Sequence, residues 1–363
     1  MRKMMLLAVT VAQIFSLSFF KEVCRSSKPD VNVVASPYSA GVALSMLLEG
    51  AEGQTKVEIG NALSGRVFND DKLDGGDSVV VRSANSVWID DNFSVRNHYV
   101  SLLQKDYDAL VETLSFADPA TVHAINNWCS ENTEGKIDGI IDELKPGDVM
   151  VLLNALYFNG PWENRFDKSL TEKAVFHGYS KQSDVDMMYR KGRYNYAEYY
   201  GCQIIELPYL DSRYSMFVAL PPAGMDVNSV IPYVDGNIYK DVFGMMAPAE
   251  VKFRMPKARL ETEMSLNGVL SAMGVKTAFT SAADFKGISL SGPLVLSEVK
   301  QKCYIDIAEG GTEAAAVTSV MVRLTSVRPE QDAYTMTVDR PYIFFIADRE
   351  SAEILFAGKI VDL

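Results

Sequence analysis

The stretch from Cys303 to Leu324 combines two patterns in direct succession. Residues 303–307 alternate between apolar and polar as a strand does, and Gly310 and Gly311 then give the backbone access to positive φ. Beyond the glycines, every second residue is uncharged and mostly small: Thr312, Ala314, Ala316, Thr318, Val320, Val322 and Leu324. A strand with this pattern can bury one face in a sheet.

The residues that follow this stretch favour an exposed loop. Residues 328–332 read Arg-Pro-Glu-Gln-Asp, and proline lacks an amide donor while the charges prefer water. The segment therefore has the composition of a strand but the position of a loop. This predicts a segment that can adopt either conformation. The alternative is a plain alanine-rich helix or flexible connector, which needs neither the alternation nor the two glycines.

The same stretch resembles the hinge of the serpins, which has the form Glu-x-Gly-Thr-Glu-Ala-Ala-Ala. The matching residues are Glu309, Gly310, Gly311, Thr312, Glu313, Ala314, Ala315 and Ala316. The segment 154–162, Asn-Ala-Leu-Tyr-Phe-Asn-Gly-Pro-Trp, and the C-terminal segment 339–346 also resemble serpin signatures. The resemblance implies an α+β serpin fold with three β-sheets, about eight or nine helices and an exposed reactive-centre loop.

The resemblance also assigns residues outside the hinge. Serpins open their central sheet around positions that match Ser36, Ser39, Asn154, Trp162 and Gln301. Many relatives have a histidine where this chain has Gln301, and a neutral amide can hydrogen-bond towards Ser39 and Asn154 without titrating. We therefore expect no pH-triggered opening through this position.

One helix of the family is missing. Between Phe68 and Ser78 most relatives have a helix that binds glycosaminoglycan in some of them, and here the residues are few and mostly acidic. We expect no polysaccharide or other cofactor.

Local signals predict several elements. Ser36 can cap a helix that starts with Pro37, and Thr55 to Glu58 has capping-box spacing for another helix. Residues 149–158 form a long apolar run that is typical of a buried strand.

Length and composition favour one domain over residues 1–363, and the resemblance implies the hinge and reactive-centre loop at 308–331. The chain has 48% hydrophobic residues and no linker that would divide it. Its net charge of −12 argues against nucleic acid or anionic membrane as a partner. Its four cysteines lie in apolar neighbourhoods, which favours buried free thiols over disulfides or a metal site: Cys24, Cys129, Cys202 and Cys303.

The N-terminus allows two interpretations. Residues 1–9 resemble the start of a secretory signal, but the apolar pattern continues beyond the cleavage zone to Val23. We favour a first helix retained in the fold. An extracellular or periplasmic location is expected, and an intracellular one stays open.

No enzyme motif is present: the chain has no Gly-x-Ser-x-Gly, His-Glu-x-x-His, P-loop or dinucleotide fingerprint. The three histidines lie in polar, loop-like contexts and are expected to be solvated: His98, His123 and His177. The resemblance instead implies a monomeric inhibitor of serine, or else cysteine, proteases. Cleavage of the loop would drive its insertion into the central sheet and trap the acyl-enzyme. The alternative is a non-inhibitory serpin that acts as a binding or chaperone protein.

The reactive bond follows from the reach of the family's loop. Seventeen residues counted from Glu309 end at Thr325, which is followed by Ser326. Arg323 and Arg328 are the alternatives, because trypsin-like proteases cleave after arginine.

Overall fold

The computed structural model describes residues 12–69, 78–210, 213–312 and 333–363. Its α-helices in this part of the chain are α2 (Ala12–Ser26), α3 (Pro37–Gly50), α4 (Gly53–Ala62), α5 (Asn97–Tyr107), α6 (Ala120–Asn132), α7 (Val227–Val230), α8 (Gly236–Met245) and α9 (Asn267–Ala272). Three short 3₁₀ helices are η2 (Lys168–Leu170), η3 (Ile231–Tyr233) and η4 (Thr277–Phe279).

The strands make up the other half of an α+β fold, as the resemblance implied. They are β1 (Val33–Ala35), β2 (Val80–Asp90), β3 (Leu110–Leu114), β4 (Met150–Pro161), β5 (Glu172–His177), β6 (Gln182–Tyr199), β7 (Cys202–Pro208), β8 (Tyr214–Leu220), β9 (Ala247–Pro256), β10 (Ala258–Ser265), β11 (Glu298–Ala308), β12 (Gly311–Thr312), β13 (Tyr334–Thr337), β14 (Tyr342–Asp348) and β15 (Ile354–Ile360).

Within the described ranges, the strands pair into two hydrogen-bonded sheets, where three were expected. A six-stranded sheet has the order β10-β11-β12-β4-β2-β3, and a nine-stranded sheet has the order β1-β15-β14-β8-β7-β6-β9-β13 with β5 attached to β6. The second sheet is continuous because the long strand β6 pairs with β5, β7 and β9 along its length. One strand therefore joins what would otherwise be two separate sheets.

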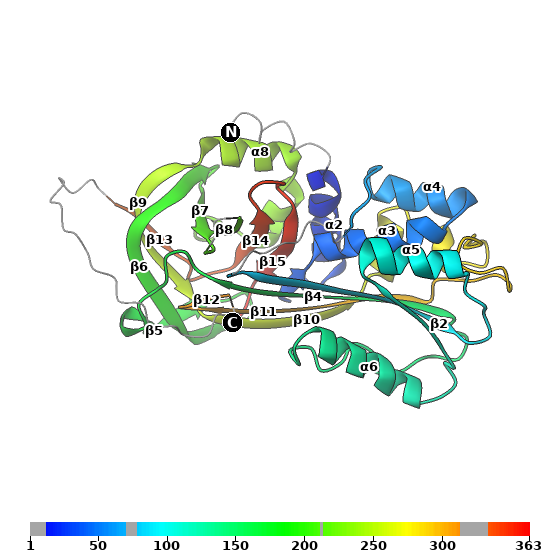
Figure 1. The fold of residues 1–363 in the computed structure, drawn as a ribbon. Coiled ribbons are helices and arrows are strands. Elements are labelled where there is room, and N and C mark those ends of the chain that lie inside the picture. Colours follow the sequence, from blue (N-terminus) through cyan, green and yellow to red (C-terminus); the bar gives the residue numbers. More distant parts are fainter. Residues whose placement is uncertain (1–11, 70–77, 211–212, 313–332) are drawn as a thin grey trace.

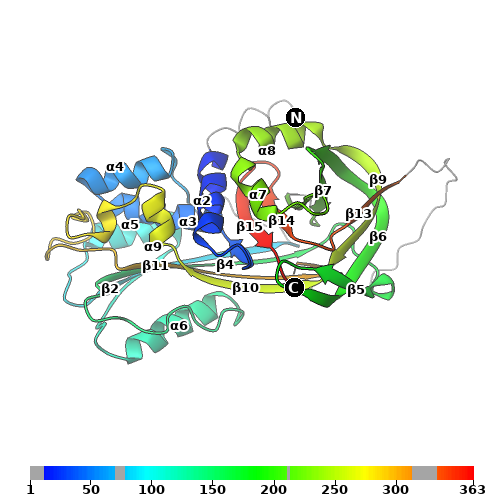
Figure 2. The ribbon, with the colours of Figure 1, turned by 180° about the vertical axis from the view of Figure 1, so that it is seen from behind.

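Helices cover both faces of the six-stranded sheet (Figure 1). Figure 2 shows the same arrangement from behind, with α6 on one side of β4 and β11 and α2, α3 and α5 on the other. The retained first helix is confirmed for residues 12–26, since Phe15, Phe19 and Phe20 of α2 are fully buried. The segment that would hold the missing helix lies mostly outside the described residues.

The start of α3 is as predicted. Ser36 is its N-cap and accepts a hydrogen bond from the amide of Ser39, and Pro37 is at the first helical position. The capping box at Thr55 is wrong: α4 begins at Gly53, and the Thr55 hydroxyl accepts instead from the amide of Asp284.

Candidate functional site

The central feature is a sheet seam between β4 and β11. These strands pair in parallel from Glu298 opposite Val151 to Cys303 opposite Leu156, and there the direct pairing ends. Above that point β12 lies between them, antiparallel to both, with Thr312 opposite Ile307 on β11 and Gly160 on β4. The first residues of the predicted hinge thus already occupy a strand position.

A tight turn brings the chain from β11 into the seam. Trp162 donates two hydrogen bonds to this turn. Its amide donates to the carbonyl of Gly310 at 3.0 Å, and its indole Nε1 donates to the carbonyl of Ala308 at 2.9 Å. The amide of Phe166 donates to the carbonyl of Glu309, also at 3.0 Å. Because these bonds reach backbone atoms, they fix the path of the turn.

Glycine is required at the second position of the double glycine. Gly311 has φ +151°, and a Cβ there would lie 2.1 Å from the carbonyl oxygen of Gly160. No L-residue fits so close to a neighbouring backbone. The hinge can enter the seam only because this position has no side chain.

Thr312 is buried on the inner face of the seam. Its side chain is 0% exposed, and its Oγ1 lies 2.6 Å from the hydroxyl of Tyr209. Trp162 stacks on the Tyr209 ring with centroids 4.6 Å apart. Burial raises the pKa of Tyr209, so the phenol stays neutral and keeps its hydrogen bond to Thr312.

The side chain of Glu309 stabilises the turn through contacts with two other segments. Its carboxylate accepts from Thr171 Oγ1 at 3.0 Å and pairs with Lys257 Nζ at 3.2 Å. Burial alone raises the pKa of this carboxyl, but hydrogen bonds from its own amide, Lys257 and Thr171 outweigh burial and hold the pKa below its usual value. The charged form is therefore the one that the fold stabilises.

The middle of the sheet contains the predicted amides. Gln301 accepts from the amide of Ser36 at 2.8 Å, donates to the carbonyl of Ser36 at 2.9 Å, and reaches the Ser39 hydroxyl at 3.5 Å. Asn154 lies directly opposite Gln301 across the strands but donates to Asn85 Oδ1 at 2.5 Å. Its own Oδ1 is buried and has no hydrogen-bond partner among the described residues.

The structure thus places Ser36, Ser39, Asn154 and Gln301 near one another at the middle of the six-stranded sheet. Trp162 contacts the hinge, where the chain turns from β11 into β12. Sequence reasoning missed Tyr209, Lys257 and Asn85, which come from distant segments. The remaining predicted residues lie outside the described residues: Glu313, Ala314, Ala315, Ala316, Thr318, Arg323, Thr325, Ser326 and Arg328.

The cysteines are free thiols, and three of them are buried as predicted, whereas Cys202 is half-buried. The histidines are exposed as predicted, but they lie on α5, α6 and β5 rather than in loops: His98, His123 and His177. None of the helices among the described residues has the length and apolar character that crossing a membrane needs.

Comparisons with known proteins agree with this architecture. The family model described as Serpin (serine protease inhibitor) matches residues 10–363. The leukocyte elastase inhibitor of Sus scrofa is 31% identical, over 95% of this chain and 97% of its own length. Among solved structures, the thermophilic serpin tengpin in its native state superimposes with a TM-score of 0.90 at 29% identity, covering 98% of this chain and 94% of tengpin.

A thyroxine-binding protein is similar as well. Human thyroxine-binding globulin complexed with thyroxine gives a TM-score of 0.88 at 25% identity and covers 99% of each chain. The chain belongs to the serpin family. Family membership supports an inhibitor rather than an enzyme, and similar proteins include both an elastase inhibitor and a thyroxine-binding globulin.

Proposed function

We propose that this serpin inhibits serine proteases, with cysteine proteases as the second class, by a suicide-substrate mechanism. The observation that carries the proposal is the position of β12 between β4 and β11. The strand pair is already parted above Cys303 and Leu156, and two hinge residues already pair with both of its edges. Insertion would extend an existing strand rather than start a new one.

In the proposed inserted state, the antiparallel register of Thr312 continues along both neighbours. Each step forward on the hinge is one step back on β4 and on β11, so Ala314 falls between Phe158 and Ile305. Ala316 then falls between Leu156 and Cys303. These four neighbours are all at most 1% exposed, so only small, uncharged side chains fit without displacing the core.

The next inward residue is Thr318, which falls between Asn154 and Gln301 in the same register. Its hydroxyl can donate to Asn154 Oδ1, the buried acceptor that has no partner among the described residues. A buried unpaired acceptor costs about 1–3 kcal/mol. Satisfying it would favour the inserted state over the native one.

The length of β4 sets where a fully inserted hinge strand would end, and so how far the reactive bond lies beyond the sheet. In this register its first residue, Met150, lies opposite Val322, so a fully inserted strand ends there. Thr325 then lies three residues beyond the end of the sheet, which leaves a short tether for the trapped protease. We propose Thr325–Ser326 as the reactive bond, with cleavage after Arg323 or Arg328 as the secondary routes.

The protease supplies the nucleophile that reacts at the Thr325–Ser326 bond. Its nucleophilic oxygen or sulfur adds to the carbonyl carbon of Thr325, the peptide bond to Ser326 breaks, and the new amine leaves with a proton. The resulting ester or thioester tethers the protease to the inserting strand. Trapping requires insertion to be faster than hydrolysis of that bond.

The test is direct. The protein is mixed with a panel of serine and cysteine proteases and analysed for an SDS-resistant complex, and the released C-terminal peptide is identified by mass spectrometry. The proposal predicts a covalent complex and a new N-terminus at Ser326. Cleavage by every protease without any complex would refute inhibition by trapping, and a new N-terminus at Leu324 or Pro329 would move the reactive bond.

A second candidate is a carrier for a small apolar molecule. A cavity of about 720 Å³ lies between the nine-stranded sheet and the segment α7–η3, with an apolar lining that includes Ile204, Phe217, Val230, Ile343 and Phe345. Such a cavity suits a drug-sized apolar ligand, and thyroxine-binding globulin shows that the family contains carriers. Against it, carriers tend to lose the small hinge residues that this chain keeps.

The carrier hypothesis is tested by titrating the protein with thyroxine and with a fluorescent apolar probe. Saturable binding together with a raised melting temperature, in a protein that traps no protease in the panel, would favour the carrier. An SDS-resistant complex would favour the inhibitor.

A further inference from the structure

A small cavity opens where β6 and β7 diverge. These two strands pair from Tyr196 opposite Ile205 to Tyr199 opposite Cys202, whereas β5 pairs with β6 over residues 182–187. In the described part of the chain, residues 188–195 of β6 pair with β9 alone. The space on the other side of these residues contains a cavity of about 280 Å³, which we call the fork cavity.

The fork cavity has an apolar wall and a polar wall. Trp162 and Phe166, which follow β4, and Leu207 of β7 line one side, and all three are at most 5% exposed. Polar side chains of β6 line the other side, among them Arg190 and Tyr194. An apolar lining with a few converging polar groups is typical of a small-molecule site.

Arg190 is held in place by two residues of its own strand. Its guanidinium carbon lies 5.0 Å from the ring centroid of Tyr194. Gly192 lies between these residues in the sequence, and a Cβ there would lie 2.9 Å from a terminal nitrogen of Arg190. The absence of a side chain at Gly192 therefore gives the guanidinium its room. The contact with the ring leaves N–H donors that can bind a carboxylate in a bidentate way.

The buried carboxylate in the wall does not neutralise Arg190. Glu206 is 4% exposed and accepts hydrogen bonds from Asn195 Nδ2 at 2.6 Å and from Ser215 Oγ at 2.8 Å. It also pairs with Arg349 Nε at 2.9 Å. Both of its oxygens are therefore already bonded to other residues.

The remaining charges lie at the rim of the cavity. Glu163 and Arg193 are exposed, and Arg193 lies directly opposite Glu250 on β9. Arg190 is half-buried and forms no ion pair with any residue that the structure describes. Because a partly desolvated charge without a counter-ion is unfavourable, an anionic ligand would stabilise this side chain.

Tyr194 independently points to a ligand. Its side chain is 6% exposed, and its hydroxyl is buried without a hydrogen-bond partner among the described residues. Burial raises the pKa of this phenol, and the nearby charge of Arg190 only partly opposes that effect. The hydroxyl therefore stays protonated and can donate. Buried hydroxyls are normally bonded, so a ligand acceptor would complete this one.

We propose that the fork cavity binds a small carboxylate with an apolar or aromatic body. Arg190 binds the carboxylate, the Tyr194 hydroxyl donates to the ligand, and the body packs against Trp162 and Leu207. The volume is slightly below the range of about 300–1,000 Å³ that is usual for drug-sized ligands. This size favours a molecule such as a single N-acylated amino acid.

The ligand would contact the segment that holds the hinge. Trp162 and Phe166 donate hydrogen bonds to the backbone of residues 308–310, and both line the fork cavity. A ligand packed against them should hold this turn in its native position and slow proteolysis of the hinge. This regulatory part rests on the proposed function, whereas binding itself does not.

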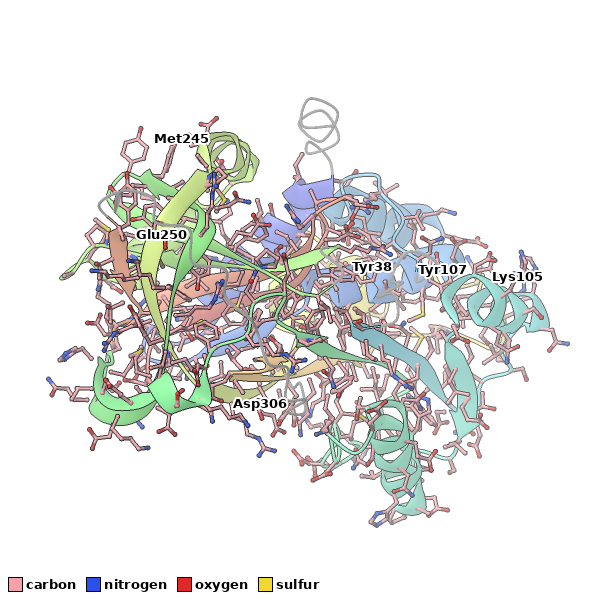
Figure 3. The ribbon with its side chains drawn as sticks, turned by 60° about the vertical axis from the view of Figure 1, so that its left-hand side comes forward. Tyr38, Lys105, Tyr107, Met245, Glu250 and Asp306 are labelled. Carbon is pink, nitrogen blue, oxygen red and sulfur yellow. The ribbon has the colours of Figure 1, made fainter. Side chains whose placement is uncertain are left out.

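Figure 3 shows where a control substitution can be placed. Glu250 lies near Met245 at the end of α8, and Lys105 and Tyr107 of α5 lie at the opposite end of the molecule. Arg193, at the rim of the fork cavity, is the sheet partner of Glu250, so the cavity is far from Lys105. Lys105→Gln removes a positive charge there and serves as the matched control for Arg190→Gln.

The experiment is calorimetric titration of the full chain with N-acetylphenylalanine and with its uncharged amide, N-acetylphenylalaninamide. The acid should bind saturably with a dissociation constant of about 1 mM or tighter, as expected for a ligand of this size. Arg190→Gln should weaken binding by at least about tenfold, and Tyr194→Phe by about 2- to 10-fold. Gly192→Ala should also weaken binding, because its Cβ displaces the guanidinium without removing a charge, and Lys105→Gln should bind as the wild type does.

Three results would overturn the proposal. Equal affinity for the acid and the amide would mean that the carboxylate is not recognised. Affinity that is unchanged in both Arg190→Gln and Tyr194→Phe would place the ligand elsewhere. Equal competition by inorganic phosphate would indicate a general anion site without recognition of the apolar body.

Proteolysis of the hinge, with and without the acid, tests the regulatory part. Slower proteolysis in the wild type but not in Arg190→Gln would support it. Binding that depends on Arg190 but leaves the rate of proteolysis unchanged would refute the link to the hinge. The titration itself requires no protease, so its outcome is independent of whether the protein traps one.

Discussion

Replacing Thr312 with arginine is the sharpest perturbation of the hinge. Thr312 is fully buried between β4 and β11, and among the described residues its hydroxyl bonds to the phenol of Tyr209. The nearby carboxylate of Glu309 is already paired with Lys257. An arginine in this position would therefore be a buried charge without a counter-ion, which costs about 3–5 kcal/mol.

That cost falls on every state in which the hinge lies in the seam. The arginine would leave the seam in the native protein and would have to re-enter it for insertion. Because about 1.4 kcal/mol corresponds to a tenfold change in rate, insertion should slow by roughly 10²- to 10³-fold or more. Hydrolysis of the acyl-enzyme is unchanged, so Thr312→Arg should be cleaved as a substrate.

The assay is the stoichiometry of inhibition, with the ratio of SDS-resistant complex to cleaved protein on the same gel. Thr312→Val is the matched control, because it keeps the shape and loses only the hydrogen bond to Tyr209, worth about 1 kcal/mol. It should trap nearly as well as the wild type. If Thr312→Arg forms as much complex per molecule cleaved as Thr312→Val, the inward face of the hinge has no part in trapping.

Three further predictions concern the surrounding structure. Gly311→Ala should expel the hinge from the seam, because its Cβ would lie 2.1 Å from the carbonyl oxygen of Gly160; faster proteolysis of the hinge checks this, and an unchanged rate contradicts it. Gln301→Leu should lower the free energy of unfolding by about 1–3 kcal/mol, since the Ser36 amide loses its partner and the Ser36 carbonyl keeps only the bond from the Ala40 amide; urea unfolding measures the loss, and a variant as stable as the wild type would be evidence against it. Burial alone raises the pKa of Glu58, but hydrogen bonds outweigh burial and lower the pKa to about 2. The contribution of the Glu58 carboxylate to folding stability is therefore complete above about pH 4.5 and is lost as the pH falls towards 2. Glu58→Gln should be less stable at pH 7 and approach the wild type at low pH, and a constant difference between them would contradict this.

Local signals predicted the elements whose determinants lie within a few residues. Ser36 and Pro37 mark the start of α3 because a cap and a first-turn proline act over one turn of helix. The apolar run 149–158 became β4, Met150–Pro161, because a strand buried on both faces needs such a run.

The errors arose where the partner is distant in sequence. The spacing of Thr55 and Glu58 fits a capping box, but Thr55 binds the amide of Asp284, and Glu58 accepts from the amides of Lys276 and Thr277. A capping motif and a tertiary contact use the same donors and acceptors, so the spacing alone does not distinguish them.

The hinge likewise combines a local sequence signal with contacts to distant residues. Alternation predicted that the segment can be a strand, but its entry into the seam depends on Gly160, Trp162 and Tyr209, which lie more than a hundred residues earlier. Gln301 was expected to bond to the neighbourhood of Ser39 and Asn154; it reaches the Ser39 hydroxyl at 3.5 Å, whereas its shorter bonds are to the backbone of Ser36 and the Asn154 amide donates to Asn85.

The melting temperature before and after cleavage of the loop tests the central claim most directly. For a chain of 363 residues, the entropy of unfolding is roughly 0.8 kcal/mol per degree. If cleavage allows the hinge to complete the six-stranded sheet, the melting temperature should rise by about 20 °C or more, which corresponds to about 15 kcal/mol. A melting temperature that stays the same or falls after cleavage would contradict the account, because a nicked surface loop that does not insert gains no structure.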